Sequence, residues 1–203
     1  MSWQSIRYTA WAPIYDRVAG FGRSRGRSLG LLNIEPGERV LLIGAGTGAD
    51  LPYIDAAADV TAVDVTPAML SRLRRRAEAL GRQVDARVGD AQSLEFAPNI
   101  FDAVVLHLIV AVADDGAAVV REAARVLKPG GRAVIFDKFA RGRLGLLRRI
   151  LNLATRALFS DINRRLGPML EGSGLEVVHR ESAAFRGQYD IVLLRKPGPG
   201  RPS

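Results

Sequence analysis

The sequence contains no cysteine and only two histidines among its 203 residues. Without thiols the chain has no disulfide bonds, no thiolate metal ligands and no cysteine nucleophile, and two histidines leave little for a metal site. We therefore expect neither a metal enzyme nor a secreted, disulfide-stabilised scaffold. No apolar run reaches the ~18 residues that a membrane-spanning helix needs, and residues 1–5 lack a signal-peptide pattern. These absences predict a cytoplasmic protein.

Hydrophobic residues make up 48% of the chain, which is enough for one α/β core. We assign residues 1–196 to a single domain. Residues 197–203 consist mainly of proline and glycine, and this composition predicts a disordered tail.

The best-defined motif is the apolar run Val40–Ile43, which is followed by alternate glycines at Gly44, Gly46 and Gly48. The run predicts a short strand that is buried on both faces. The glycines predict a turn that passes close to a ligand before a helix begins. The spacing G-x-G-x-G differs from the G-x-G-x-x-G of dinucleotide-binding enzymes, because Ala49 stands at the place of their third glycine.

Further apolar runs alternate with helical patterns along the chain. Strands are expected at residues 60–63, 84–88, 103–108, 132–136, 175–179 and 189–194. Helices are expected at residues 8–33, 68–81, 114–127 and 161–171, and the segment 128–131 is expected to stop the third of them. Arg25 and the neighbouring arginines of the first helix are expected on its solvated face. Right-handed crossovers then give an α/β, doubly wound sheet, with antiparallel pairing of the last two strands.

Asp64 follows the second strand, sixteen residues after Gly48. This is close to the spacing at which nucleotide-binding α/β units place an acid on a ribose, where one carboxylate accepts from both hydroxyls. The alternative is that Asp64 caps the helix that begins near Thr66.

Five motifs in this order resemble those of class I S-adenosylmethionine (SAM) dependent methyltransferases. They are residues 40–48, 60–64, 89–91, 101–106 and 125–131. The resemblance implies a Rossmann-like sheet of seven strands in the order 3-2-1-4-5-7-6, with an antiparallel last strand. It also implies a methyltransferase (EC 2.1.1 class) that uses SAM as its cofactor.

The resemblance also implies a set of cofactor-binding residues. In relatives an acid at the position of Asp90 accepts from the adenine amino group, and Met69 offers an apolar wall, with core packing as its alternative. At Leu42 the family usually has an acid that helps to hold the methionine end of SAM. The residues implied are Gly44, Ala45, Gly46, Gly48, Asp64, Val65, Met69, Asp90, Ala91 and His107.

Three residues are candidates for a catalytic role in methyl transfer, which needs alignment above all and needs a base only for some acceptors. His107 and Asp137 are expected at the carboxyl edge of the sheet, where open α/β folds bind ligands. The alternative for His107 is a structural histidine, and the alternative for Asp137 is a salt bridge with Lys138 or a nearby arginine. Tyr15 lies in a segment, 15–17, that resembles the family's entry motif, so residues 1–35 are expected to form an N-terminal helical lid.

Basic residues are concentrated in one helical insert, residues 138–172. Between 138 and 165 there are eight basic residues and one acidic residue. Such a block favours an anionic partner, and an amphipathic basic helix suits the inner face of a membrane. The alternative is that the apolar stripe at 144–158 is buried against the sheet. The chain has no N-P-P-Y-like tetrad and no interleaved aromatics for stacking a base, which argues against nucleic acid.

The finer resemblance is to bacterial phosphatidylethanolamine N-methyltransferases and to ubiquinone and menaquinone methyltransferases. It implies a lipophilic or membrane-associated acceptor, with a phospholipid amine preferred. The alternatives are a quinone-type C- or O-methyltransferase, a small-molecule methyltransferase, or a non-catalytic SAM-binding protein. The sequence carries no signal for the oligomeric state.

Overall fold

The structure is a computed structural model, and it describes residues 21–139, 166–183 and 188–198. Most of the expected N-terminal lid, most of the basic insert and residues 199–203 of the expected tail lie outside the described residues. The predictions for those segments therefore stay predictions.

The described residues form strands, α-helices and one 3-10 helix, η1. The strands are β1 (Arg39–Ile43), β2 (Asp59–Asp64), β3 (Asp85–Val88), β4 (Phe101–His107), β5 (Leu127–Lys138), β6 (Glu176–Ser182) and β7 (Tyr189–Arg195). The helices are α2 (Gly22–Leu32), η1 (Leu51–Tyr53), α3 (Pro67–Ala79), α4 (Gly116–Val126) and α6 (Leu166–Leu170).

One seven-stranded sheet organises the molecule, with the order β3-β2-β1-β4-β5-β7-β6. Neighbouring strands from β3 to β5 pair in parallel. Strand β7 is antiparallel to both β5 and β6. The expected α/β class, the strand order and the antiparallel last strand are confirmed.

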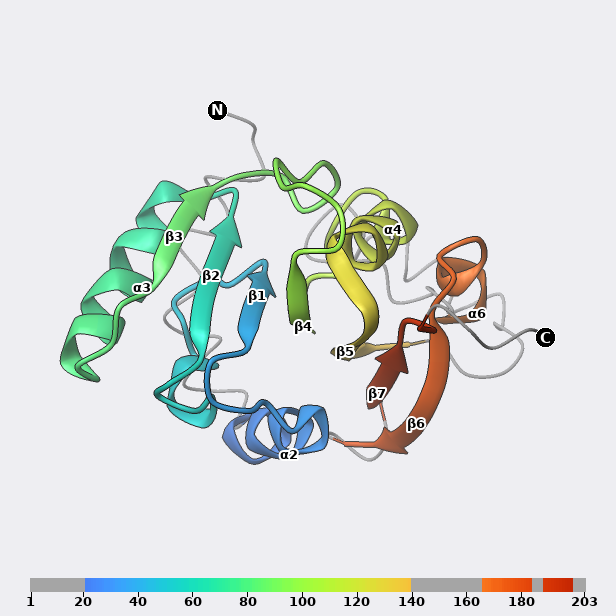
Figure 1. Cartoon of the computed structure of the whole chain (residues 1–203), viewed down its shortest axis with the longest axis horizontal. Coiled ribbons are helices and arrows are strands. Elements are labelled where there is room, and N and C mark those ends of the chain that lie inside the picture. Colours follow the sequence, from blue (N-terminus) through green and yellow to red (C-terminus); the bar gives the residue numbers. More distant parts are fainter. Residues whose placement is uncertain (1–20, 140–165, 184–187, 199–203) are drawn as a thin grey trace, which may run out of the picture.

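Helices cover both faces of the sheet (Figure 1). Helices α4 and α6 pack on one face, and α2 and α3 pack on the other. Strand β4 contributes to both layers: Val104 and Leu106 face α4, whereas Ala103 and Val105 face α2. Because neither face of β4 meets water, the strand needs an apolar residue at nearly every position. The continuous apolar run in the sequence has this physical cause.

The sequence prediction was wrong at the start of β5. Residues 128–131 were expected to be a helix stop outside the sheet, but α4 ends at Val126 and the chain enters β5 directly. The pairing with β4 shifts between Leu127 and Arg132, and Gly130 in the intervening segment has φ +80°. The glycines therefore accommodate a bulge in the strand rather than a loop. Strand β6 also runs three residues beyond the expected end at His179.

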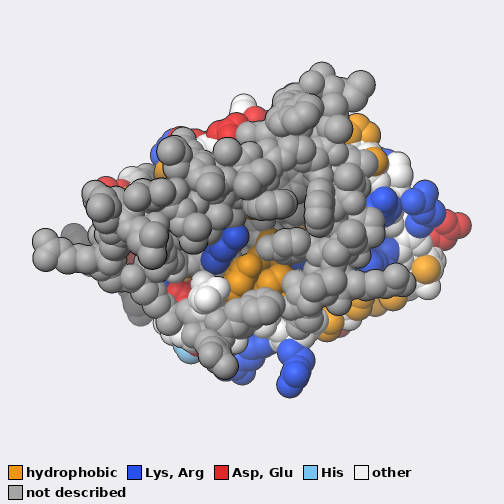
Figure 2. All heavy atoms as spheres, turned by 180° about the vertical axis from the view of Figure 1, so that it is seen from behind, with side chains coloured by type: hydrophobic (Ala, Val, Ile, Leu, Met, Phe, Trp, Pro, Cys, Tyr) orange, Lys and Arg blue, Asp and Glu red, His pale blue; other side chains and the backbone are white. Residues whose placement is uncertain are grey.

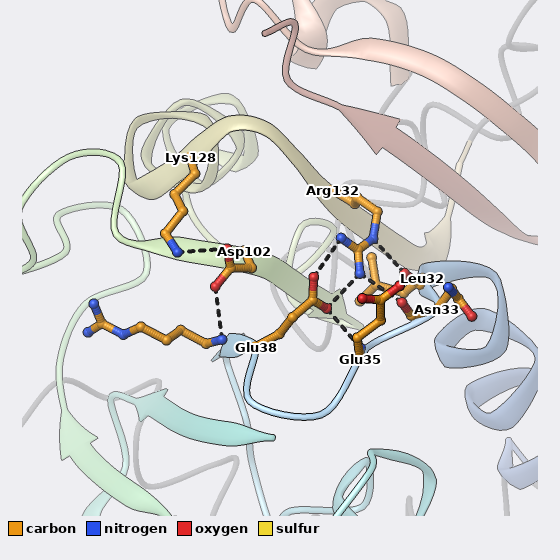
Figure 3. Close-up of polar contacts among 8 residues, drawn as sticks. Leu32, Asn33, Glu35, Glu38, Asp102, Lys128 and Arg132 are labelled. Carbon is orange, nitrogen blue, oxygen red and sulfur yellow. Dashed lines mark hydrogen bonds and ion pairs between the residues drawn. The ribbon is translucent and has the colours of Figure 1, made fainter. Parts of the chain in front are cut away.

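The amino edge of the parallel strands is held by paired charges (Figure 3). Arg132 donates to both oxygens of Glu38, and it also donates to the carbonyl oxygens of Leu32 and Asn33 at 2.7 Å each. Asp102 accepts from Lys128 at 2.7 Å and from the backbone N–H of Arg39 at 3.0 Å. These contacts connect α2, β1, β4 and β5.

The arginines of α3 lie at the surface, as expected. Arg74 and Arg75 are exposed, whereas Leu70 and Leu73 of the same helix are fully buried. From behind, blue and red side chains stand together at the edge where α3 lies (Figure 2). This charge is therefore the solvated side of an amphipathic helix.

Candidate functional site

The carboxyl ends of four parallel strands meet at one edge of the sheet. Strand β1 leads into the glycine loop, β2 ends at Asp64, β4 ends at His107 and Asp137 lies at the end of β5. Open α/β sheets bind ligands at this edge. The structure thus brings these sequence-predicted residues to one side of the fold.

The three glycines of the loop have positive φ, namely +67° at Gly44, +54° at Gly46 and +75° at Gly48. Their surroundings differ. A Cβ atom on Gly44 would lie 2.7 Å from the Ile109 side chain, and one on Gly48 would lie 3.0 Å from Leu73. A Cβ on Gly46 would meet no atom of the described residues within 4 Å. Gly44 and Gly48 are therefore needed for packing, whereas Gly46 leaves its side open for a ligand.

Asp64 connects the end of β2 to the glycine loop. Its Oδ2 accepts from the backbone N–H of Gly46, and its Oδ1 accepts from that of Thr66, each at 2.8 Å. Burial raises the pKa of the Asp64 carboxyl, and the two backbone hydrogen bonds oppose this shift. Thr66, not Asp64, is the N-cap residue of α3. The Thr66 side chain also hydrogen-bonds the Asp64 carboxylate, and the role of Asp64 with ribose hydroxyls stays a prediction.

The side of the site expected to hold adenine combines exposed apolar and carboxylate groups. Val65, just after β2, is 59% exposed, and Asp90 is exposed beyond β3. Asp90 accepts from the backbone N–H of Gln92 at 2.9 Å. Met69 and Ala91 are buried, at 5% and 9% exposed. Val65 and Asp90 are therefore exposed at this edge, whereas Met69 packs inward, and the roles of these residues in cofactor binding stay predictions.

His107 lies in the interior, with a side chain that is 1% exposed. Its Nδ1 lies 2.7 Å from Asp50 Oδ1, and its Nε2 lies 2.8 Å from Ser28 Oγ. The ring packs edge-on against Phe136, with centroids 5.7 Å apart. A role as general base would require His107 to give up one of these two hydrogen bonds. The geometry fits the alternative of a structural histidine, and the catalytic and cofactor-binding assignments stay predictions.

Sequence reasoning missed the partners of His107. Ser28 and Asp50 are buried, and Arg25 donates to Asp50 Oδ1 at 2.7 Å with only 11% of its side chain exposed. The expectation that Arg25 lies on a solvated face was therefore wrong. Burial favours the neutral form of Asp50, but attraction to His107 and Arg25 and their hydrogen bonds outweigh it and hold the pKa of Asp50 well below its usual range.

Asp137 is a second fully buried carboxylate, 1% exposed. Its Oδ2 accepts from the backbone N–H of Ala111 at 2.9 Å, and its Oδ1 accepts from that of Lys138 at 2.8 Å. Burial is the main influence and raises the pKa of Asp137 to about 6. Asp190 on β7 pairs with Asp137 across the strands and binds Arg180 at 2.6 Å. The two backbone N–H groups therefore fix the orientation of the Asp137 carboxylate.

Leu42 is part of the core beneath α2. It is 1% exposed and belongs to the same apolar cluster as Leu29 and Phe136. The position at which the resemblance led us to expect an acid is therefore used for core packing in this chain. Tyr15 lies outside the described residues, so its predicted roles in the lid and in catalysis stay predictions.

The described residues fit a cofactor that contains adenosine. Gly46 offers an open backbone, Asp64 and Asp90 offer carboxylate acceptors, and Val65 offers an exposed apolar surface for a flat base. In the described ranges, no group of three or more His, Asp or Glu side chains could hold a metal ion.

Comparisons with known proteins point in the same direction. Residues 41–135 match a family model described as a methyltransferase domain. The phosphatidylethanolamine N-methyltransferase of Cereibacter sphaeroides is 38% identical over 145 residues, which are 68% of this chain and 70% of that protein. The demethylmenaquinone methyltransferase of Renibacterium salmoninarum is 37% identical over 131 residues, which are 64% of this chain and 53% of that protein. The chain thus spans about half the length of the second relative.

A solved structure of a geranyl diphosphate methyltransferase in complex with SAM has a similar fold. Its TM-score is 0.71 at 18% identity, and the match covers 86% of this chain and 85% of that chain. At this identity the likeness shows the fold alone.

Proposed function

The chain belongs to the class I SAM-dependent methyltransferases, and from this premise we propose that its acceptor is a lipophilic, membrane-associated amine such as the headgroup of phosphatidylethanolamine. SAM is the cofactor. The observation that carries the choice of acceptor is the 38% identity to a phosphatidylethanolamine N-methyltransferase over 70% of that relative's length.

Asp137 supports an amine acceptor on physical grounds. SAM supplies a methyl group on a positively charged sulfur, so the positive charge is on the acceptor nitrogen after transfer. A carboxylate with a pKa of about 6 is ionised at neutral pH. Held by two backbone N–H groups at the end of β5, the buried Asp137 places a fixed negative charge at this edge of the sheet, and that charge stabilises the positive charge that develops on the amine.

His107 is poorly suited to act as the general base that would deprotonate a carbon or phenol acceptor. Both of its ring nitrogens have hydrogen-bond partners in a buried setting. A neutral amine attacks through its own lone pair and needs no strong base, whereas a carbon or phenol acceptor needs a base. The quinone alternative rests on the 37% identity to a demethylmenaquinone methyltransferase.

The basic insert supports a peripheral position on an anionic membrane. Residues 138–165 carry eight basic residues and one acidic residue. Each basic residue near an anionic leaflet contributes about 1 kcal/mol. Within the described residues, no helix is long and apolar enough to cross a membrane.

The acceptor is tested with labelled SAM and vesicles that contain phosphatidylethanolamine, phosphatidylglycerol alone, or phosphatidylglycerol with demethylmenaquinone. Label is expected in the phosphatidylethanolamine headgroup. Asp137→Asn should reduce turnover about tenfold or more, whereas Asp102→Asn, a carboxylate change at the amino edge, should leave it unchanged. Label only in the quinone would replace the proposal by its alternative. SAM binding without any labelled product would favour a non-catalytic SAM-binding protein.

Membrane docking is tested separately by sedimentation with anionic and zwitterionic vesicles. Wild-type binding should prefer the anionic vesicles and weaken as salt rises, because exposed charges are screened over about 10 Å at 0.1 M salt. Arg148→Glu combined with Arg149→Glu should weaken it further. Equal binding to both lipids, or none to either, contradicts the docking proposal and leaves the SAM assignment untouched.

A further inference from the structure

A chain of buried polar contacts joins α2 to the end of the glycine loop. Ser28 Oγ lies 2.8 Å from His107 Nε2, and His107 Nδ1 lies 2.7 Å from Asp50 Oδ1. Arg25, one turn before Ser28, donates to the same Asp50 oxygen at 2.7 Å. We call these four residues the α2–loop network. Its members come from three separate parts of the sequence.

The side chain of Asp50 does not make the helix-capping hydrogen bond that its position in the sequence favours. It occupies the N-cap position of η1, where an aspartate usually accepts from the first free N–H groups of the helix. Here its side chain makes no capping hydrogen bond, its backbone is already helical, and its carboxylate is turned toward His107 and Arg25. A buried carboxylate is costly unless it is paired. Local capping is thus given up for a contact with α2.

The residues after His107 are also constrained. Leu108 has φ +60°, which is unusual for a leucine, and its N–H donates to the carbonyl oxygen of Phe136 at 2.8 Å. The next side chain, Ile109, lies so close to Gly44 that no Cβ fits there. The end of β4 is therefore in direct contact with the start of the glycine loop.

The glycine loop is held at two points. Asp64 holds Gly46 from the β2 side, and the α2–loop network holds Asp50 from the α2 side. Resting on the assignment of this loop to SAM binding, we propose that His107 and Asp50 are positioning residues that fix the loop relative to α2. The consequence is that α2 is part of the cofactor site and that His107 is not the general base.

Two substitutions of His107 separate positioning from base catalysis. The amide of asparagine reaches about as far as Nδ1 of an imidazole, and that of glutamine about as far as Nε2. His107→Asn therefore keeps a donor for Asp50, whereas His107→Gln keeps only a partner for Ser28. We expect the SAM dissociation constant, measured by calorimetry, to rise about tenfold in His107→Gln and less than threefold in His107→Asn. Turnover at saturating SAM should stay within about threefold of wild type in both.

The opposite pattern overturns the proposal. If both variants bind SAM as the wild type does and both lose turnover a hundredfold or more, His107 acts as a base. Because SAM binding is measured without acceptor, a wrong choice of acceptor does not affect this test. A wild-type protein that failed to bind SAM would instead contradict the assignment of the loop.

Substitution of Arg25 provides a second test, because it leaves Ser28, His107 and Asp50 of the α2–loop network unchanged. Arg25→Gln removes the ion pair with Asp50, and Arg27→Gln is its matched control on the same helix. Arg27 is 60% exposed and pairs with Glu181, away from the loop. The SAM dissociation constant should rise about fivefold in Arg25→Gln and change less than twofold in Arg27→Gln. Equal affinity in both folded variants would contradict a role of α2 in the cofactor site.

Discussion

The two edges of the sheet use carboxylates in opposite ways. At the amino edge, the hydrogen bond from Arg132 lowers the pKa of Glu38, and the hydrogen bond and charge of Lys128 outweigh burial and lower the pKa of Asp102. At the carboxyl edge, burial raises the pKa of Asp64 and of Asp137, whose hydrogen bonds come from backbone N–H groups. The first edge is stabilised by ionised acids, and the second holds Asp64 and Asp137 at a cost to stability. Asp50 at the second edge differs from these two, because Arg25 and His107 pair with it and lower its pKa.

This difference separates stability from function within one sheet. Paired charges at the amino edge join α2, β1, β4 and β5 (Figure 3). Unfavourable features at the other edge include buried acids and the left-handed Leu108. Such features persist where the surrounding structure enforces them, and they gather at ligand sites.

The largest expected effect is a pH dependence at the carboxyl edge. Asp137 has a pKa of about 6 in the folded protein and about 3.9 in the unfolded chain. The folded state thus binds the proton more tightly, so the stability that Asp137 contributes is highest below pH 4 and is lost as pH rises from about 4 to about 6. The loss is about 3 kcal/mol. Urea unfolding of the wild type and Asp137→Asn between pH 4 and 7 should show the variant gaining relative stability as pH rises.

Glu38→Gln is the matched variant at the amino edge, and its pH dependence should have the opposite sign. The pKa of Glu38 is lowered in the folded state, so its stabilisation is present above the unfolded pKa and is lost as pH falls. Glu38→Gln should therefore lose relative stability as pH rises. If the relative stabilities of Glu38→Gln and Asp137→Asn changed with pH in the same direction, the proposed contrast between the two edges would be wrong.

A smaller effect is expected from Arg132→Met. The change leaves Glu38 without its charged partner and removes the arginine donor from two carbonyl oxygens at the end of α2. It should lower the free energy of unfolding by about 2 kcal/mol and leave the SAM dissociation constant unchanged. Arg195→Met, an exposed position opposite Arg132 in the strand register, is the control and should change stability by less than about 0.5 kcal/mol. A tenfold loss of SAM affinity in Arg132→Met would show that the edges are coupled.

Local signals predicted most of the fold. The runs at Val40–Ile43 and 103–108 mark buried strands because both of their faces meet helices, and the glycine loop has its own spacing. The strand order came from the resemblance of five motifs rather than from periodicity. At 128–131 local reasoning failed, because lysine, proline and two glycines favour a stop and only the partner strand makes them a bulge.

The α2–loop network could not be predicted from local patterns. Ser28 and His107 are 79 residues apart in sequence. Arg25 is flanked by small residues and by two other arginines, so its composition indicates a solvated face. Only the packing of α2 over the loop distinguishes Arg25, 11% exposed, from Arg27, 60% exposed. The side chains that control the geometry of a site are in this case specified by tertiary contacts, whereas those that line it follow a motif.

The smallest expected effect on stability comes from substituting two glycines that both have a positive φ angle. Gly46 has φ +54° and Gly81, after α3, has φ +64°, and for both a Cβ would meet no described atom within 4 Å. Alanine in the left-handed region costs about 1 kcal/mol, so Gly46→Ala and Gly81→Ala should lower the free energy of unfolding about equally. Only Gly46→Ala should raise the SAM dissociation constant, by about tenfold or more, because its new methyl group occupies the side of the loop that faces the cofactor. Equal SAM affinity in the two variants would mean that the open side of Gly46 is not where SAM lies, and the functional edge of the sheet would have to be placed elsewhere.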